Sequence, residues 1–304
     1  MKTVREFLEA ARRIPPKRMA VVFAQDEFVL EAVQDACQAG IVFPILIGDA
    51  AEINRLREHL GFAHPCEIID EPDAEKASRI GVDLVNRGEA DLIMKGILDT
   101  KVLLKAVVNS ETGIKASKLL SHVGIVSFPG FDRVLFVTDG AMNIAPGAEE
   151  KILILENAVS LAHSLGYECP KVGIVSSVEK VNPKIASTVD AEAIKAHYAE
   201  FPPQGFLVDG PFAVDNLVSE DSVRHKGILS PVAGKADILL FPNLDAGNVF
   251  YKTSVFLGHA EAAGLVIGAK VPIVLTSRAD SAETKSNSIA LGVLSCHGLS
   301  HSRH

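Results

Sequence analysis

The sequence predicts an α/β protein with mostly parallel sheets and helices on both faces. Short apolar, β-branched runs alternate with segments of helical spacing along most of the 304 residues, and this pattern is typical of parallel strands joined by helical crossovers. The runs around residues 121–138 instead indicate an antiparallel hairpin. This interruption suggests a boundary between two α/β domains, the number that the chain length also favours.

In the first half, each expected strand leads into a helix. The strands are short apolar runs of the kind that parallel sheets bury on both faces. A charged, amphipathic segment at 1–13 is expected to be a helix rather than a signal peptide. The expected strands are 18–24, 41–48, 66–70 and 91–94, and the helices after them are 26–39, 49–60, 73–86 and 102–109.

The second half begins with a loop at 110–118 and the hairpin, whose expected strands are joined by the turn sequence Pro129-Gly130-Phe131-Asp132. Pro146 is expected early in its helix, where its missing N–H does no harm. Asp280 and Glu283 have the form of a capping box, which places the start of the last helix there. The expected strands are 121–128, 133–138, 171–176, 206–209, 237–241 and 271–276, and the helices are 146–165, 183–197, 246–263 and 281–294.

Composition excludes several classes of function. The formal net charge is −8 and there is no basic tract, which argues against non-specific nucleic-acid binding. No apolar run approaches the ~20 residues needed to span a membrane. The cysteines form no C-x-x-C pair, so reduced cytoplasmic thiols are expected rather than disulfides or a zinc site. They are Cys37, Cys66, Cys169 and Cys296.

Five turns with charged or amide side chains follow the expected strands. One such turn is weak evidence for a site, because turns favour Gly, Asp and Asn in any case. The carboxyl ends of parallel strands share one edge of a sheet, so we expect these turns to converge on a polar cleft. The turns are Met94-Lys95-Gly96, Thr138-Asp139-Gly140, Asp209-Gly210-Pro211, residues 242–248 and Ser277-Arg278.

The last of these turns is the strongest candidate for an anion site. Ser277 and Arg278 stand where a buried strand ends and a helix begins. The free N–H groups and partial positive charge of a helix N-terminus suit anions, and a guanidinium fits two phosphate oxygens. The alternative for Arg278 is a surface arginine on a turn.

Several common catalytic motifs are missing from the sequence. No G-x-G-x-x-G follows an expected strand, and the phosphate-loop-like stretch at 227–236 is too long and has Ala236 where Ser or Thr is needed. There is no G-x-S-x-G elbow and no H-E-x-x-H. The histidines lack ligand spacing, so no metal site is expected.

Taken together, the motifs resemble those of the phosphotransacylase family, which includes phosphate acetyltransferases and phosphate butyryltransferases. The resemblance covers nearly the whole chain, and the motifs occur in the family's order. Those typical of the family are Val208-Asp209-Gly210-Pro211, Asp245-Ala246-Gly247-Asn248 with Tyr251-Lys252, and Ser277-Arg278. Those that resemble the butyryl branch are Met94-Lys95-Gly96-Ile97-Leu98-Asp99-Thr100 and Thr138-Asp139-Gly140-Ala141-Met142-Asn143-Ile144.

The resemblance implies a fold and a reaction. The fold is that of the isocitrate and isopropylmalate dehydrogenases, with two α/β domains, here 1–128 with 268–304 and 129–267, and an active-site cleft between them. The reaction is reversible transfer of a short-chain, butyryl-like acyl group between coenzyme A and inorganic phosphate in a ternary complex. Coenzyme A and phosphate are substrates, no tightly bound cofactor is implied, and a cytoplasmic homodimer or higher homo-oligomer is expected.

The resemblance also implies roles for particular residues. Ser277 and Arg278 are the expected catalytic residues, and Asp280 or Asp245 is the candidate base, because Thr284 occupies the position of the acetyl branch's aspartate. Asp280 is alternatively only the helix cap. The expected substrate-binding residues are Lys95, Gly96, Thr100, Asp139, Asn143, Asp209, Gly210, Gly247, Asn248 and Lys252. The candidates for the phosphates of coenzyme A are Lys101, Lys115 and Lys118, each of which is alternatively a surface charge.

Three other functions remain as alternatives. One is an acetyl-specific or acyl-carrier-protein-specific relative of the same fold. A decarboxylating NAD-dependent dehydrogenase is disfavoured, because that family's Gly-Ser-Ala-Pro-Asp run and arginine-rich substrate motif do not occur. A non-enzymatic binding protein that kept the cleft is the third.

Overall fold

The computed structural model describes residues 2–276 and 280–301. The protein is an α/β protein with mostly parallel, mixed sheets, as predicted. Its contacts divide the chain into two compact units. The first unit holds Val4–Lys118 and the residues from Ala262 onward, and the second unit holds Leu119–Glu261 with the first residues of the chain.

The first unit is built on strands in the order β3-β2-β1-β4-β11-β10. Their pairings are parallel except for β10 with β11, which is antiparallel. Strand β1, in the middle of this sheet, is fully buried from Met19 to Val22, as expected for a sheet with helices on both faces. The strands are β1 (Lys17–Val22), β2 (Val42–Gly48), β3 (Glu67–Asp70), β4 (Leu92–Lys95), β10 (Glu261–Ile267) and β11 (Ile273–Val274).

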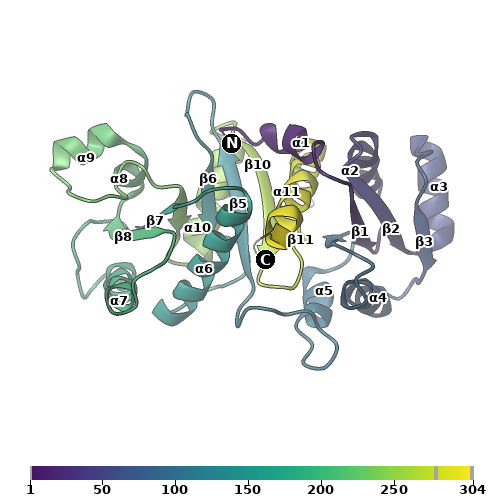
Figure 1. Ribbon diagram of the computed structural model, residues 1–304, viewed down its shortest axis with the longest axis horizontal. Helices are drawn as coiled ribbons and strands as arrows, with labels where there is room; N and C mark the ends of the chain where they lie inside the picture. The colour runs from purple at the N-terminus through teal and green to yellow at the C-terminus, as the bar shows by residue number, and fades with distance from the viewer. Residues whose placement is uncertain (1, 277–279, 302–304) are drawn as a thin grey trace. The chain divides into compact units, whose positions relative to one another are not determined.

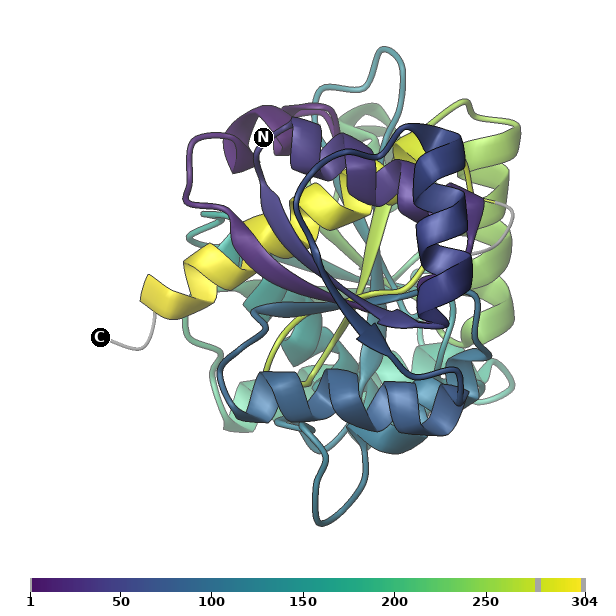
Figure 2. The same ribbon diagram turned by 90° about the vertical axis from the view of Figure 1, so that its right-hand side faces the viewer.

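Helices cover both faces of this sheet (Figure 2). Helices α1, α2 and α11 lie on one face, and α4 and α5 lie on the other. Four helices begin at an aspartate whose carboxylate accepts N–H groups of the first turn, which is the usual N-cap interaction. The helices are α1 (Glu6–Ala11), α2 (Glu27–Gln38), α3 (Ala50–Leu60), α4 (Ala74–Asn86), α5 (Thr100–Val107) and α11 (Ala282–His301).

The second unit has strands in the order β5-β6-β9-β7-β8, and helix α7 lies against β8 (Figure 1). The predicted hairpin is present as the antiparallel pair β5–β6, and the other pairings are parallel. The strands are β5 (Ser121–Ser127), β6 (Leu135–Thr138), β7 (Lys171–Val175), β8 (Leu207–Phe212) and β9 (Ile238–Leu240). The helices are α6 (Ala148–Ser164), α7 (Ala186–Glu200), α8 (Val214–Val218), α9 (Glu220–Lys226) and α10 (Leu244–Phe256).

The expected helix at 246–263 is wrong in its second half. Helix α10 ends at Phe256, and His259 then has a φ of 51°, which a helix does not accept. The alanine-rich residues after it form β10, because they pair with β11 in the sheet. The short helices α8 and α9 were not predicted either.

Two helix starts also differ from expectation. Pro146 lies outside α6, whose N-cap is Gly147. The expected capping box of Asp280 and Glu283 is wrong, since Ser281 Oγ accepts the N–H of Thr284 at 3.1 Å and so caps α11.

The two units divide at 118/119 and 261/262, whereas the expected domain boundaries were 128/129 and 267/268. Strand β5 falls in the second unit because it pairs with β6 along Val123–Val126.

Candidate functional site

In the first unit, candidate residues gather where β4 and β11 end. The strands run in parallel with Ile93 opposite Ile273 and Met94 opposite Val274. This register places Lys95 beside the residues that lead out of β11. Ser277 and Arg278, the predicted catalytic pair, follow there but lie outside the described residues.

Lys95 and Gly96 are held tightly at the end of β4. The Lys95 side chain is 7% exposed, and its Nζ donates to the carbonyl oxygens of Gly96 (3.0 Å) and Leu98 (3.1 Å). A Cβ on Gly96 would stand 2.0 Å from the carbonyl oxygen of Phe23, so only glycine fits this approach to the segment after β1. The Gly96 N–H donates to Val22 O at 2.8 Å, which fixes the turn.

The three lysines expected near coenzyme A are exposed on two segments of the first unit. Lys101 lies in the first turn of α5, where Asp99 Oδ1 accepts its backbone N–H at 2.8 Å. Thr100, the first residue of that helix, is half-buried. Lys115 and Lys118 lie on the segment before β5, with Lys115 Nζ 3.4 Å from Lys118 O.

Helix α11 begins with the other candidates of this unit. Asp280 immediately precedes the N-cap, and Thr284 is 8% exposed with its Oγ1 3.1 Å from Ser281 Oγ. Because Ser281 is the cap, the capping role does not account for Asp280. Its role as a base remains a prediction.

The second unit holds a cluster of hydrogen bonds around Asp139, at the end of β6. This carboxylate is 2% exposed and accepts five N–H groups. Its Oδ1 accepts the backbone N–H of Ala141 (2.8 Å) and Met142 (3.0 Å). Its Oδ2 accepts the backbone N–H of His122 (3.2 Å) and both the backbone N–H (3.3 Å) and Nδ2 (2.6 Å) of Asn143. The buried carboxylate of Asp139 therefore fixes the conformation of the turn after β6.

The N-terminus of α10 packs closely on this turn. A Cβ on Gly140 would stand 2.8 Å from the carbonyl carbon of Gly247, and one on Gly247 would stand 2.7 Å from Asp139 O. Asn248 Nδ2 donates to Gly140 O at 3.1 Å. Asp245 is exposed in the first turn of the helix. The structure thus brings Asp139, Asn143, Gly247 and Asn248 together, and substrate binding by these residues remains a prediction.

His122 belongs to this cluster and was missed by the sequence reasoning. His122 contacts Tyr251 edge-on, with ring centroids 6.4 Å apart, and its carbonyl oxygen accepts Thr138 Oγ1 at 2.9 Å. The register of the hairpin, with Val123 opposite Thr138, places His122 beside Asp139; the sequence indicated the hairpin but not this register. Lys252 Nζ lies 5.9 Å from the Tyr251 ring centroid.

Asp209 and Gly210 lie apart from the Asp139 cluster. They are on β8, at the edge of the sheet and separated from β6 by β9 and β7. Lys195 Nζ is 2.7 Å from Asp209 Oδ1. Burial alone would raise the pKa of Asp209, but hydrogen bonds from Lys195, Ser230 and the Gly210 N–H, with the charge of Lys195, lower it below its usual value. Substrate binding by Asp209 remains a prediction.

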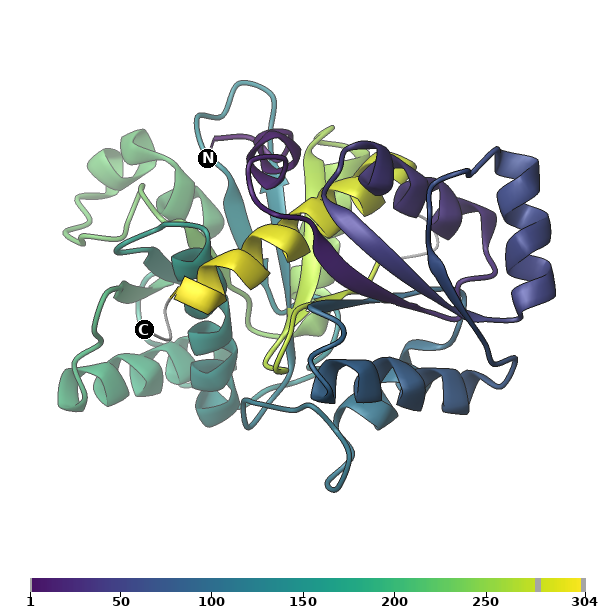
Figure 3. The ribbon, with the colours of Figure 1, turned by 45° about the vertical axis from the view of Figure 1, so that its right-hand side comes forward.

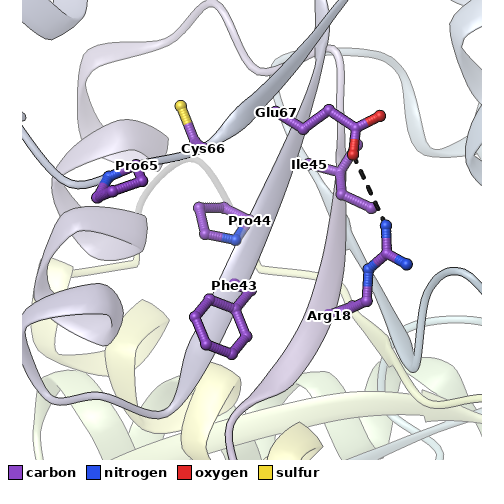
Figure 4. Close-up of a pocket in the computed structure, with 7 residues that line it drawn as sticks. All are labelled: Arg18, Phe43, Pro44, Ile45, Pro65, Cys66 and Glu67. Carbon is purple, nitrogen blue, oxygen red and sulfur yellow. Dashed lines mark ion pairs between the residues drawn. The ribbon is translucent and has the colours of Figure 1, made fainter.

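The first unit has a pocket of about 310 Å³ that does not include Lys95 or Gly96 (Figure 4). Its wall includes the starts of β2 and β3 and an ion pair of 3.6 Å between Arg18 and Glu67. It therefore lies at the amino edge of the parallel strands, opposite the edge of Lys95. Its lining residues are Arg18, Phe43, Pro44, Ile45, Pro65, Cys66 and Glu67.

Among the side chains that the structure describes, no three His, Cys, Asp or Glu lie close enough together to hold a metal ion. No helix in the described part of the chain has both the length and the apolar character to cross a membrane.

Known proteins resemble this chain along most of its length. A family model described as phosphate acetyl/butaryl transferase matches residues 64–293. A phosphate butyryltransferase of Clostridium beijerinckii is 43% identical over 96% of this chain and 97% of its own length. A phosphate acetyltransferase of Thermotoga maritima is 43% identical over 91% of this chain and 95% of its own length. A branched-chain phosphotransacylase from Enterococcus faecalis matches the structure with a TM-score of 0.83 at 34% identity, covering 92% of this chain and 99% of that one.

Proposed function

Because the chain belongs to the phosphate acetyl/butaryl transferase family, we propose that it is a phosphate acyltransferase that moves a short-chain acyl group reversibly between coenzyme A and inorganic phosphate. The observation that supports this most strongly is the nearly full-length similarity to transferases of this kind. The resemblance seen in the sequence motifs is thereby confirmed. Neither a dehydrogenase nor a non-enzymatic binding protein accounts for that similarity as well.

We propose a butyryl-like acyl group as the preferred substrate. Overall identity does not separate butyryl from acetyl, since relatives of both names are equally identical to this chain. The two motifs at residues 94–100 and 138–144 favour the butyryl branch. A pocket that is selective by one or two methylenes changes the ratio of rates by roughly 10–200-fold for each methylene, so the preference is measurable.

The proposed mechanism is direct attack of phosphate on the thioester in a ternary complex. A phosphate oxygen bonds to the acyl carbon, the carbon–sulfur bond breaks, and the departing thiolate takes a proton. Arg278 would hold the phosphate through charge-assisted bonds. Ser277 would donate to the tetrahedral oxyanion, where one donor is worth about 10²–10³ in rate. Asp280 or Asp245 would exchange the thiol proton.

The remaining candidates divide between the two units. In the first unit, Lys95, Gly96 and Thr100 are proposed to bind substrate. The exposed lysines at 101, 115 and 118 are proposed to bind the phosphates of coenzyme A. In the second unit, the buried hydrogen bonds of Asp139 give the turn a fixed shape, which suits a binding surface. The proposed binding residues there are Asn143, Asp209, Gly210, Gly247, Asn248 and Lys252.

We also propose a domain architecture, an oligomeric state and a cellular location for the protein. The two units are proposed to be the domains of an isocitrate and isopropylmalate dehydrogenase-like fold, in a homodimer or higher homo-oligomer. Coenzyme A and phosphate act as substrates, with no tightly bound cofactor. The cytoplasm is the proposed location, because acyl-CoA is available there and free thiols stay reduced.

A thiol-release assay tests the function. Purified protein with butyryl-CoA and phosphate should release coenzyme A and form butyryl phosphate in equal amounts. Release should need phosphate, and acetyl-CoA should be used more slowly than butyryl-CoA. No phosphate-dependent release from either thioester would refute the proposal, and faster release from acetyl-CoA would refute the butyryl preference alone.

A further inference from the structure

Helix α11 carries a buried lysine in its first turns. Lys285 is 4% exposed. It is the fourth residue of α11, which follows β11 in the chain. The helix runs beside α2 (Figure 3). The Phe28 ring of α2 lies next to the lysine, with the ring centroid 5.9 Å from Lys285 Nζ.

Among the residues that the structure describes, no carboxylate pairs with this ammonium. Lys285 Nζ donates one hydrogen bond, of 2.5 Å, to the carbonyl oxygen of Asp280. In the described part of the chain, no Asp or Glu carboxylate lies within 4.0 Å of it. An ammonium has three N–H donors, so the Asp280 carbonyl leaves two of them available for another acceptor.

This position is unfavourable for folding alone. Removing a cation from water is costly unless it is paired. The N-terminal end of a helix also carries a partial positive charge, which repels a lysine in the first turns. An apolar side chain of similar length would avoid both costs, so a buried charge at this position suits a residue that binds an anion.

Resting on the proposed function, we infer that Lys285 is an anion-binding residue of the transferase, with inorganic phosphate as its counter-ion. A small dianion fits a side chain that is almost fully covered, whereas the phosphates of coenzyme A are attached to a bulky nucleotide. The hydrogen bond to Asp280 O keeps the ammonium at the turn between β11 and α11. Binding of phosphate there supplies the negative charge that none of the described carboxylates provides.

Steady-state kinetics of Lys285→Met test the inference. Loss of one charge-assisted contact should raise KM for phosphate by about 10–100-fold, while KM for butyryl-CoA stays within about twofold of wild type. Lys285→Arg, which keeps the charge, should recover part of the phosphate affinity. Lys270→Met is the matched control, since that lysine is exposed in the same unit and bonds Asn86, and its kinetics should equal those of wild type.

A thermal-shift measurement gives a second readout without turnover. Inorganic phosphate should raise the Tm of wild type and Lys270→Met, and this rise should be absent or much smaller in Lys285→Met. The rise with coenzyme A should be similar in all three. If Lys285→Met does not fold, Lys285→Arg decides, because its longer, planar head should change KM for phosphate and leave KM for butyryl-CoA unchanged.

Two results would overturn the inference. One is a normal phosphate KM and a normal phosphate-induced rise in Tm for Lys285→Met. The other is an equal increase of both KM values together with a lower Tm, which would assign Lys285 a structural role only. Failure of the wild-type protein to use phosphate would instead refute the proposed function, so the two failures are distinguishable.

Discussion

Replacing Asp139 by asparagine is expected to destabilise the second unit strongly. The carboxylate accepts two N–H groups on Oδ1 and three on Oδ2. Asparagine has one acceptor oxygen, so in its better orientation the amide NH₂ still faces two of these donors. At about 1.5–3 kcal/mol for each hydrogen bond to a charged acceptor, the change should cost roughly 3–6 kcal/mol.

Urea unfolding followed by circular dichroism measures this cost. Asp132→Asn is the control, because that side chain is 83% exposed and pairs only with Arg133 among the residues that the structure describes. Its free energy of unfolding should change by less than about 1 kcal/mol. The reasoning about Asp139 would be refuted if both variants unfolded within about 1 kcal/mol of wild type.

Three further results are expected. Arg278→Ala should lower turnover by at least about 10²-fold without changing the urea midpoint. Lys195→Met should destabilise the protein at pH 7, and the difference should shrink below about pH 4, because the stability that comes from the lowered pKa of Asp209 is lost as the carboxylate is protonated. Iodoacetamide at pH 8 should modify the exposed Cys169 long before Cys37, because burial raises the pKa of the Cys37 thiol to about 12.

Each of these expectations has a contrary outcome. Near-normal turnover of Arg278→Ala would remove that residue from the mechanism. Lys184→Met, which changes an exposed lysine of the same unit, should leave stability unchanged at both pH values. An equal loss in the two lysine variants would disprove a specific ion pair with Asp209. Early modification of Cys37 would show that its thiol is not covered as described.

Local sequence patterns were sufficient to predict the positions of most strands. The strands that lead into helices are short apolar runs between turn residues, and β1, β2, β4 and β7 lie where these runs predicted them. The exception is β10, whose alanines have high helix propensity. These residues form a strand only because they pair with β11, and a nonlocal partner leaves no signal in the local pattern.

The candidate site was predictable where it depends on turns after strands. Gly96, Gly140 and Gly247 each occupy a position without room for a side chain, and the motifs marked all three. The environment of Lys285 was not predictable, because a lysine is almost never fully buried unless it is paired. Its burial comes from packing against α2, which depends on residues far away in the sequence.

Isotope exchange tests direct attack by phosphate most sharply. Labelled coenzyme A is incubated with unlabelled butyryl-CoA and the enzyme, with phosphate left out. In a ternary-complex mechanism the acyl group leaves coenzyme A only when phosphate is bound, so no label should enter butyryl-CoA until phosphate is added. Rapid exchange without phosphate would reveal an acyl-enzyme intermediate and contradict the direct mechanism.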